Sequence, residues 1–228
     1  MKKTFLTSVL LLGFIIAIGQ TADSTYTVST DFKHIVFNVV SDSNSDYYYP
    51  KLEGKVKNSM SELTATECYY LYYGRLFKNE HKGLPFLASS ERMDFDKALS
   101  KGNCTKIIKL GIPLLENNPV DLTVLLHTCR CLNDKKDERW EEYNTLFTKL
   151  LDAIFSEGTG QGPETAIKVV DVEDEHIIKG ILGFIGGTEG LYMNENLPGR
   201  VFNVWSLGGQ KLYFEELFFE DTEGLKLN

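Results

Sequence analysis

Three consecutive carboxylates and a histidine, Glu173 to His176, are the residues whose types most directly suggest acid/base chemistry. Such a cluster supplies a general acid and a general base when burial or a like-charged neighbour shifts its pKa values. The same residues follow Asp171 at the start of an apolar helical pattern, where carboxylates are stabilised by the helix dipole. The helix-terminus interpretation is favoured, and a functional acid cluster is the alternative.

A metal site is the second chemistry to consider, because His127 and Cys131 stand four residues apart on one side of a predicted helix, with Cys129 between them. A structural zinc ion needs four ligands, usually in spaced pairs, and no second pair is present in the sequence. We therefore expect the cysteines to pack in the core, and we predict neither a metal nor a cofactor.

The glycine-rich run of residues 158–162, Gly-Thr-Gly-Gln-Gly, raises the question of a phosphate-binding loop. It lacks the Lys-Ser/Thr of a Walker loop, and it leads from a predicted helix into a predicted strand, whereas nucleotide loops lead from a strand into a helix. It is interpreted as a helix end and a turn. The sequence also contains no nucleophile elbow, zinc-protease helix or cofactor fingerprint, so no familiar class of enzyme is indicated.

Tyrosines are concentrated at residues 47–49 and 69–73. At helical spacing such rings usually belong to the core. The alternative is an aromatic groove for a peptide or a glycan, with an arginine at its edge. The candidate binding residues are Tyr47, Tyr48, Tyr49, Tyr72, Tyr73 and Arg75.

Hydrophobic periodicity defines the elements that position these residues. Thr64 and Glu67 form a capping box for a helix over residues 64–78, and residues 47–50 are interpreted as an extended segment. Other helices are expected near residues 32–39, 90–100, 104–117, 122–133, 140–157 and 173–182. Strands are expected over residues 166–172, 191–194, 201–205 and 211–219.

Helices followed by strands make this an α+β chain. The predicted architecture is a set of tetratricopeptide-like antiparallel helices packed with a small C-terminal antiparallel sheet. The tetratricopeptide likeness rests on residues 102–137, where one helix closes at Asn118-Pro119 and the next opens at once. We expect one α+β domain over residues 20–228, with a helical part at about 31–158 and a strand-rich part at about 163–219.

The first 19 residues have the pattern of a cleaved signal peptide, with Lys2 and Lys3 before an apolar run. Cleavage is expected between Gly19 and Gln20, with a cut after Ala22 as the alternative. Export to the periplasm or secretion is therefore predicted. Loss of the two lysines takes the formal net charge from −8 to −10. Such a charge argues against nucleic-acid and membrane-surface partners.

Cysteine spacing does not match a disulfide-framework domain, although an exported protein meets oxidising conditions. If a single bridge forms, Cys104 to Cys129 across neighbouring helices is the predicted pair. Free, buried thiols are the favoured interpretation, and the bridge is the alternative.

Motifs along most of the mature chain resemble those of an exported family from the Bacteroidota, domain-of-unknown-function family 4919. They are Tyr48-Tyr49-Pro50 with Leu52, Leu71-Tyr72-Tyr73-Gly74, Asn118-Pro119, Ser156-Glu157-Gly158-Thr159-Gly160, the strand at 166–170, and Leu212-Tyr213-Phe214. The resemblance implies an exported protein with no assigned activity. It also implies a histidine where this chain has Lys168 and a Pro-aromatic pair where this chain has residues 81–86.

Two functions follow from the sequence. The first is a non-enzymatic binding or assembly module of the cell envelope with a protein or peptide partner. The second is a hydrolase of unfamiliar type, acting on envelope or imported peptides or glycans. Its carboxylates would come from Glu173, Glu175, Glu215 and Glu216.

Overall fold

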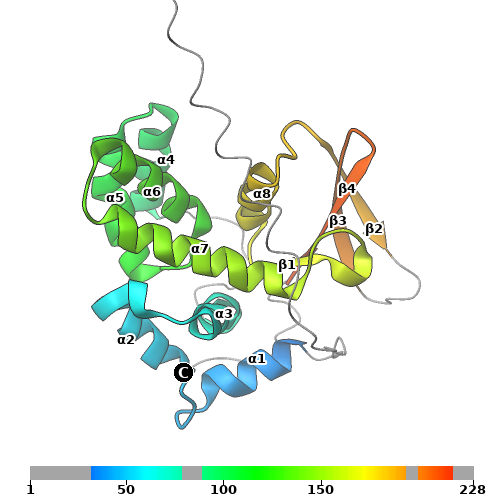
Figure 1. Cartoon of the computed structure of the whole chain (residues 1–228), viewed down its shortest axis with the longest axis horizontal. Helices are drawn as coiled ribbons and strands as arrows, with labels where there is room; N and C mark the ends of the chain where they lie inside the picture. The colour runs from blue at the N-terminus through cyan, green and yellow to red at the C-terminus, as the bar shows by residue number, and fades with distance from the viewer. Residues whose placement is uncertain (1–31, 79–88, 194–199, 218–228) are drawn as a thin grey trace, which may run out of the picture. The chain divides into compact units, whose positions relative to one another are not determined.

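A computed structural model describes residues 32–78, 89–193 and 200–217. Within them the chain has the predicted α+β organisation, with helices first and a four-stranded sheet in the C-terminal part (Figure 1). The signal peptide, its cleavage site at Gly19 and Gln20, and residues 81–86 lie outside the described residues. Every helix in the described ranges is too short or too polar to span a bilayer.

The first helices are α1 (Phe32–Ser41), α2 (Tyr49–Ser59) and α3 (Ala65–Gly74), with single 3-10 turns at Met60–Glu62 and Arg75–Phe77. The prediction of an extended segment at residues 47–50 is wrong at its end, because Tyr49 and Pro50 begin α2. Proline is tolerated in the first turn of a helix, where its missing N–H would be unpaired in any case. Tyr49, Leu52 and Val56 then recur at helical spacing and are buried.

The capping box of α3 is confirmed. The Thr64 hydroxyl accepts a hydrogen bond of 3.2 Å from the Glu67 backbone nitrogen, and a Glu67 carboxylate oxygen accepts one of 2.7 Å from the Thr64 nitrogen. Leu71, Tyr72 and Tyr73, which lie near the end of α3, are all buried.

Four further helices follow as predicted: α4 (Ser90–Ser100), α5 (Cys104–Asn117), α6 (Leu122–Lys135) and α7 (Trp140–Glu157). Side chains of Ser89, Asn103 and Asp121 cap the first three of these helices. Each helix contacts the next one along the chain. The likeness of this segment to tetratricopeptide repeats stays a prediction.

The predicted bridge between Cys104 and Cys129 is wrong in its second partner, because the disulfide joins Cys104 to Cys131 with their Cα atoms 5.0 Å apart. Cys104 begins α5 and Cys131 lies near the end of α6, so these ends meet when the two helices pack side by side. Residues two positions apart on a helix, such as Cys129 and Cys131, point in directions about 200° apart around its axis. Cys129 therefore points elsewhere and is a buried free thiol, as is Cys68.

The strand-rich part contains β1 (Ile167–Val169), α8 (Val172–Ile181), β2 (Thr188–Met193), β3 (Val201–Leu207) and β4 (Gln210–Glu216). The strand order is β1-β4-β3-β2. Three strands are antiparallel as predicted, but β1 pairs with β4 in parallel, so the sheet is mixed. Parallel pairing needs a long connection, and α8 with the two hairpins supplies it.

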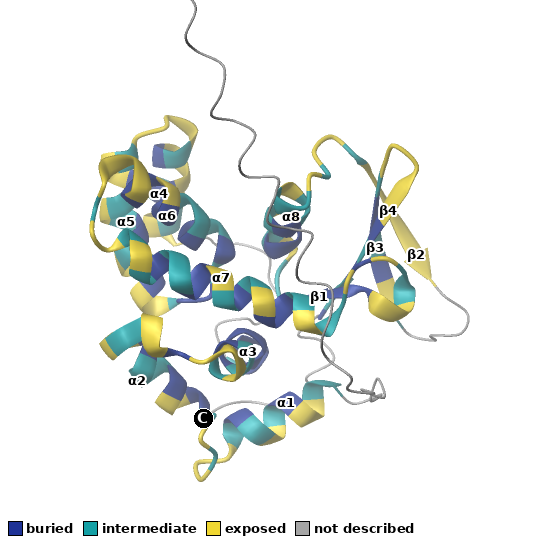
Figure 2. Cartoon of the chain, viewed as in Figure 1, coloured by how far each residue is buried: buried dark blue, intermediate teal, exposed yellow. Residues whose placement is uncertain are grey.

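Side chains alternate between the two faces of the sheet along each strand. On β3, Asn203 and Trp205 face α8, while Val204 and Ser206 face the opposite side of the sheet. Figure 2 shows buried positions on the central strands and exposed positions along all of β2. The sheet is thus well covered near β1 and β4 and uncovered at β2.

Candidate functional site

The first turn of α8 holds the acidic cluster that the sequence singled out. Asp171 caps the helix by accepting a hydrogen bond of 3.0 Å from the Glu173 nitrogen. Glu173 remains near the surface, whereas Asp174 and Glu175 are only 2% and 1% exposed. Carboxylates that only compensate a helix dipole stay in solvent, so the burial of Asp174 and Glu175 needs a further explanation.

Glu175 is held by two donors from β3. Its Oε1 accepts a hydrogen bond from Nε1 of Trp205, and its Oε2 lies 3.0 Å from the Asn203 amide nitrogen. The same amide nitrogen donates across 2.7 Å to Oε1 of Glu216 at the end of β4. Asn203 therefore joins two carboxyl groups that come from different elements.

Glu216 is the member of this pair whose pKa is displaced from its ordinary value. Burial raises the pKa of Glu216 to about 7, and the neighbouring charge of Glu175 acts in the same direction. A carboxyl group with a raised pKa beside a second carboxyl group is an arrangement that some enzymes use for acid/base chemistry. The sequence indicated Glu175 and Glu216 as possible catalytic carboxylates, but it did not predict that they lie close together.

Asp174 is paired with the core of the helical part. The Tyr72 hydroxyl donates to its Oδ2 across 2.8 Å and accepts a hydrogen bond of 3.2 Å from the Val170 nitrogen. Burial raises the pKa of Asp174 to about 8; the nearby Arg75 opposes this rise and Asp171 adds to it. Asp174 is therefore a neutral, buried acid at neutral pH.

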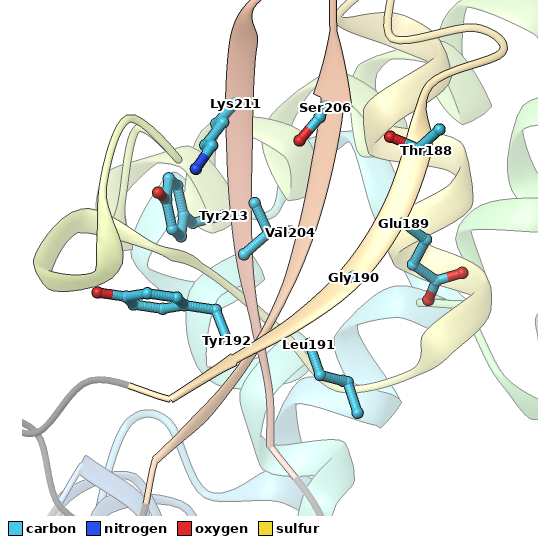
Figure 3. A pocket seen from close by; sticks show the side chains of 9 residues that line it. All are labelled: Thr188, Glu189, Gly190, Leu191, Tyr192, Val204, Ser206, Lys211 and Tyr213. Atoms are coloured by element: carbon cyan, nitrogen blue, oxygen red, sulfur yellow. The ribbon is translucent and has the colours of Figure 1, made fainter.

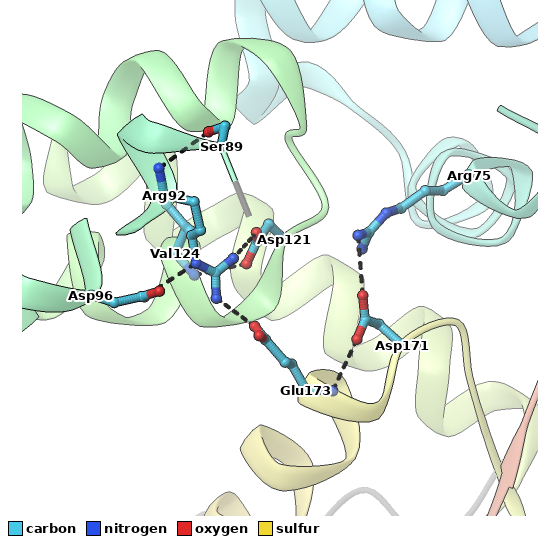
Figure 4. Close-up of polar contacts among 8 residues, drawn as sticks. All are labelled: Arg75, Ser89, Arg92, Asp96, Asp121, Val124, Asp171 and Glu173. Atoms are coloured by element: carbon cyan, nitrogen blue, oxygen red, sulfur yellow. Dashed lines mark hydrogen bonds and ion pairs between the residues drawn. The ribbon is translucent and has the colours of Figure 1, made fainter. Parts of the chain in front are cut away.

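Two arginines of the helical part form ion pairs with residues at the start of α8, as Figure 4 shows. Arg92 of α4 pairs with Glu173 and with Asp121, the capping residue of α6, at 2.6 Å. Arg75 lies 3.3 Å from Asp171, and its Nε atom is buried without a hydrogen-bond partner among the described residues. The cluster thus links α3, α4, α6 and α8.

The residues predicted to line an aromatic groove lie partly in the core and partly near the surface. Tyr49, Tyr72, Tyr73 and Arg75 are buried, whereas Tyr47 and Tyr48 are half-buried. The ring of Tyr47 stacks on that of Tyr70 with centroids 4.7 Å apart. Their role in ligand binding stays a prediction, and the burial agrees with the core interpretation of these rings.

Lys168 occupies the position where the resemblance implied a histidine. It is buried, and its ammonium group lies 2.8 Å from Oε2 of Glu157. The other oxygen of Glu157 accepts a hydrogen bond of 2.7 Å from the hydroxyl of Tyr69. Lys168 is thus part of an internal ion pair between α7 and β1.

The glycine-rich run after α7 is shaped by close packing. A Cβ atom at Gly158 would lie 2.3 Å from the carbonyl oxygen of Ala166, and one at Gly160, where φ is +73°, would lie 2.5 Å from Leu212. These contacts explain both glycines without a phosphate. Among the described residues, no group of three His, Cys, Asp or Glu side chains is arranged to hold a metal ion.

A second feature, on the opposite side of the sheet, was not found from the sequence. An open depression crosses β2, β3 and β4, with a volume of about 210 Å³ (Figure 3). It is lined by Thr188, Glu189, Gly190, Leu191, Tyr192, Val204, Ser206, Lys211 and Tyr213. These residues are spread over three strands, so only the strand register could have brought them together.

A family model described as a domain of unknown function (DUF4919) matches residues 33–196. The chain belongs to this family. No curated protein and no solved structure matches the chain.

The DUF4919 match includes the helical part, β1, α8 and β2, and it ends before β3. Tyr72, Asp174 and Glu175 therefore lie inside the matched range, whereas Asn203 and Glu216 lie beyond it. The depression is divided in the same way, since its β2 residues are inside the match and its β3 and β4 residues are outside.

Proposed function

We propose that this DUF4919 protein is an exported, non-enzymatic binding module of the cell envelope, and that it binds a protein partner through β2. The observation that carries the proposal is the position of the exposed apolar side chains. Leu191 and Met193 of β2 are both 77% exposed, and Val201, which pairs with Met193 in register, is 43% exposed. An apolar surface of this kind commonly marks an interaction site.

The geometry of β2 suggests how the partner binds. β2 is an edge strand that pairs only with β3 among the described strands, so its outer N–H and C=O groups are available to an added strand. Leu191 and Met193 share the face that also carries Glu189. A partner strand with apolar residues opposite the first two and a basic residue near Glu189 would be complementary.

Export is supported by the signal-peptide pattern of residues 1–19 and by the disulfide between Cys104 and Cys131. Disulfides persist in oxidising compartments and are rare in the cytosol. A module with an exposed apolar strand edge would meet its partner after export.

The proposal is tested by photocrosslinking in cells, with the crosslinking residue at position 191 or 193 and, as a control, at Met93. Met93 is a half-exposed apolar residue on α4. We expect one partner to be captured from β2 and not from α4. The purified partner should then bind the wild-type protein and the Ile35→Lys, Met93→Lys double variant, but not the Leu191→Lys, Met193→Lys double variant. Equal capture from both positions would contradict the proposal.

The alternative function, a hydrolase, is favoured by Glu175 and Glu216, two carboxyl groups that both accept a hydrogen bond from the Asn203 amide. Against it, Glu175 is 1% exposed and already accepts two protein hydrogen bonds. Glu173 and Glu215 are also engaged, with Arg92 and Arg200 respectively. Turnover of a peptide, ester or glycan substrate that is lost in a folded Glu175→Gln variant would establish the hydrolase and remove the binding proposal.

A further inference from the structure

The depression of Figure 3 opens on the face of the sheet opposite α8, and β2 forms one side of it. Its floor is formed by Gly190 and Val204, which are paired in register. Tyr192 and Tyr213 form one wall, with ring centroids 5.8 Å apart and planes at 81°. Lys211 and Ser206, a second registered pair, stand at the other side.

The depression is rich in polar groups that have no hydrogen-bond partner among the described residues. Hydroxyls of Thr188, Tyr192, Ser206 and Tyr213 and the ammonium group of Lys211 line it, and none of the five forms a hydrogen bond or ion pair with another described residue. The lining also contains one carboxylate, Glu189, which forms no ion pair with Lys211. An ammonium group without a carboxylate partner favours an anionic ligand at the Lys211 side of the depression.

The size of the depression limits the ligand to about one ring. Its volume of about 210 Å³ is below the roughly 300–1,000 Å³ of pockets that enclose drug-sized molecules. Gly190 has no side chain, so the floor of the depression stays open at this position. No packing contact requires the glycine, since a Cβ atom there would have no neighbour within 4 Å.

We propose that this depression binds a hexuronic acid residue of an acidic glycan. The sugar carboxylate would pair with Lys211, and the apolar face of the ring would pack against Tyr192 and Tyr213. The ring hydroxyls would exchange hydrogen bonds with Thr188, Ser206 and the tyrosine hydroxyls. The ammonium group, the four hydroxyls and the two tyrosine rings would then each have a partner of the matching chemistry.

A peptide with a free C-terminal carboxylate is the competing ligand. Peptides that bind along sheets depend on unpaired backbone groups at an edge. The depression instead crosses β3, whose backbone is paired on both sides by β2 and β4. A peptide over β3 would find only side chains to bind. A surface that offers side-chain hydroxyls suits a polyhydroxylated ring better than a peptide.

The test is isothermal titration of the purified mature protein with α-1,4-digalacturonic acid and with the neutral disaccharide galabiose. We expect the acid to bind and the neutral sugar to bind at least about tenfold more weakly, because a charge-assisted contact is lost. Lys211→Met should weaken binding of the acid by a similar factor. Lys57→Met, which removes an exposed lysine on α2, should leave the binding unchanged.

A second pair of variants tests the location. Gly190→Leu fills the depression and should abolish binding of digalacturonic acid, while the thermal midpoint confirms that the variant folds. Met193→Ser changes an exposed residue of β2 that does not line the depression, and it should bind the acid as the wild type does.

Three outcomes overturn the inference: neither sugar binds, both bind equally well, or the acid binds Gly190→Leu as tightly as wild type. Tight binding of an acetylated dipeptide in place of digalacturonic acid would assign the depression to peptide carboxylates. The β2 proposal is judged separately, because crosslinking at residues 191 and 193 reads out capture of a protein partner, whereas the titration reads out binding of a sugar.

Discussion

The hydroxyl of Tyr72 donates a hydrogen bond of 2.8 Å to Oδ2 of Asp174, joining residues 102 positions apart in the sequence. Tyr72 is on α3 and Asp174 is in the first turn of α8, and both are almost completely buried. The same hydroxyl accepts from the Val170 nitrogen. One phenol oxygen therefore connects the helical part, the end of β1 and the start of α8.

Two substitutions at Tyr72 separate the hydroxyl from the ring. Tyr72→Ala leaves a cavity in the core and should cost about 3–5 kcal/mol of unfolding free energy. Tyr72→Phe keeps the ring but leaves Asp174 without its donor, so we expect a cost of about 1–3 kcal/mol. Urea denaturation measures both, and Tyr48→Phe, at a half-buried position, should change little. An unchanged midpoint for Tyr72→Ala would mean that its ring is exposed, which would favour the groove hypothesis.

The raised pKa of Asp174 makes stability depend on pH. In the folded protein its pKa is about 8, compared with 3.8 for the free side chain. Between these values the folded state binds a proton that the unfolded state has lost, so the contribution to stability is complete at low pH and decreases as pH rises towards 8. The limiting slope for one group is about 1.4 kcal/mol per pH unit.

This dependence is isolated by subtracting the stability of Asp174→Asn from that of the wild type between pH 4 and pH 9. The difference should decrease with rising pH and level off above pH 8. The subtraction is needed because Glu216, with its pKa raised to about 7, acts in the same direction, and His127, with its pKa lowered mainly by burial, acts in the opposite direction. A difference that does not change with pH would show that Asp174 is ionised in the folded protein.

Much of the fold could be predicted because it is encoded locally. The Thr64–Glu67 capping box and the helices near residues 90–157 depend on residues within a few positions of one another, and they were found. The start of α2 was missed because three tyrosines and a proline also fit an extended segment. The parallel pairing of β1 with β4 depends on contacts between distant residues, which no local pattern contains.

The candidate sites were less accessible to sequence reasoning for the same physical reason. Glu175 and Glu216 were both singled out, but Asn203, which joins them, lies in an ordinary strand pattern. The depression depends on strand register, which places Gly190, Val204 and Tyr213 side by side. Alternation along β2 and β3 was the only available signal, and it does not specify which residues become neighbours.

The mature chain should begin at Gln20. Lys2, Lys3 and the apolar run that follows them have the form of a signal peptide, and small residues precede the expected cut. N-terminal sequencing of protein recovered from the periplasm or the medium checks this, and a start after Ala22 would still be cleavage of the same segment. Intact Met1 in the membrane fraction would instead make the apolar run an anchor.

The Cys104–Cys131 disulfide should contribute measurably to the free energy of unfolding. It closes a loop with a sequence separation of 27, for which the chain-entropy model gives about 3.5 kcal/mol. We expect dithiothreitol to lower the unfolding free energy of the wild type by roughly this amount. The Cys104→Ala, Cys131→Ala double variant should be insensitive to dithiothreitol, whereas Cys129→Ala should respond as the wild type does. Peptide mapping without reduction should recover Cys104 linked to Cys131, and a Cys104–Cys129 peptide would show that the thiols of α6 are arranged differently.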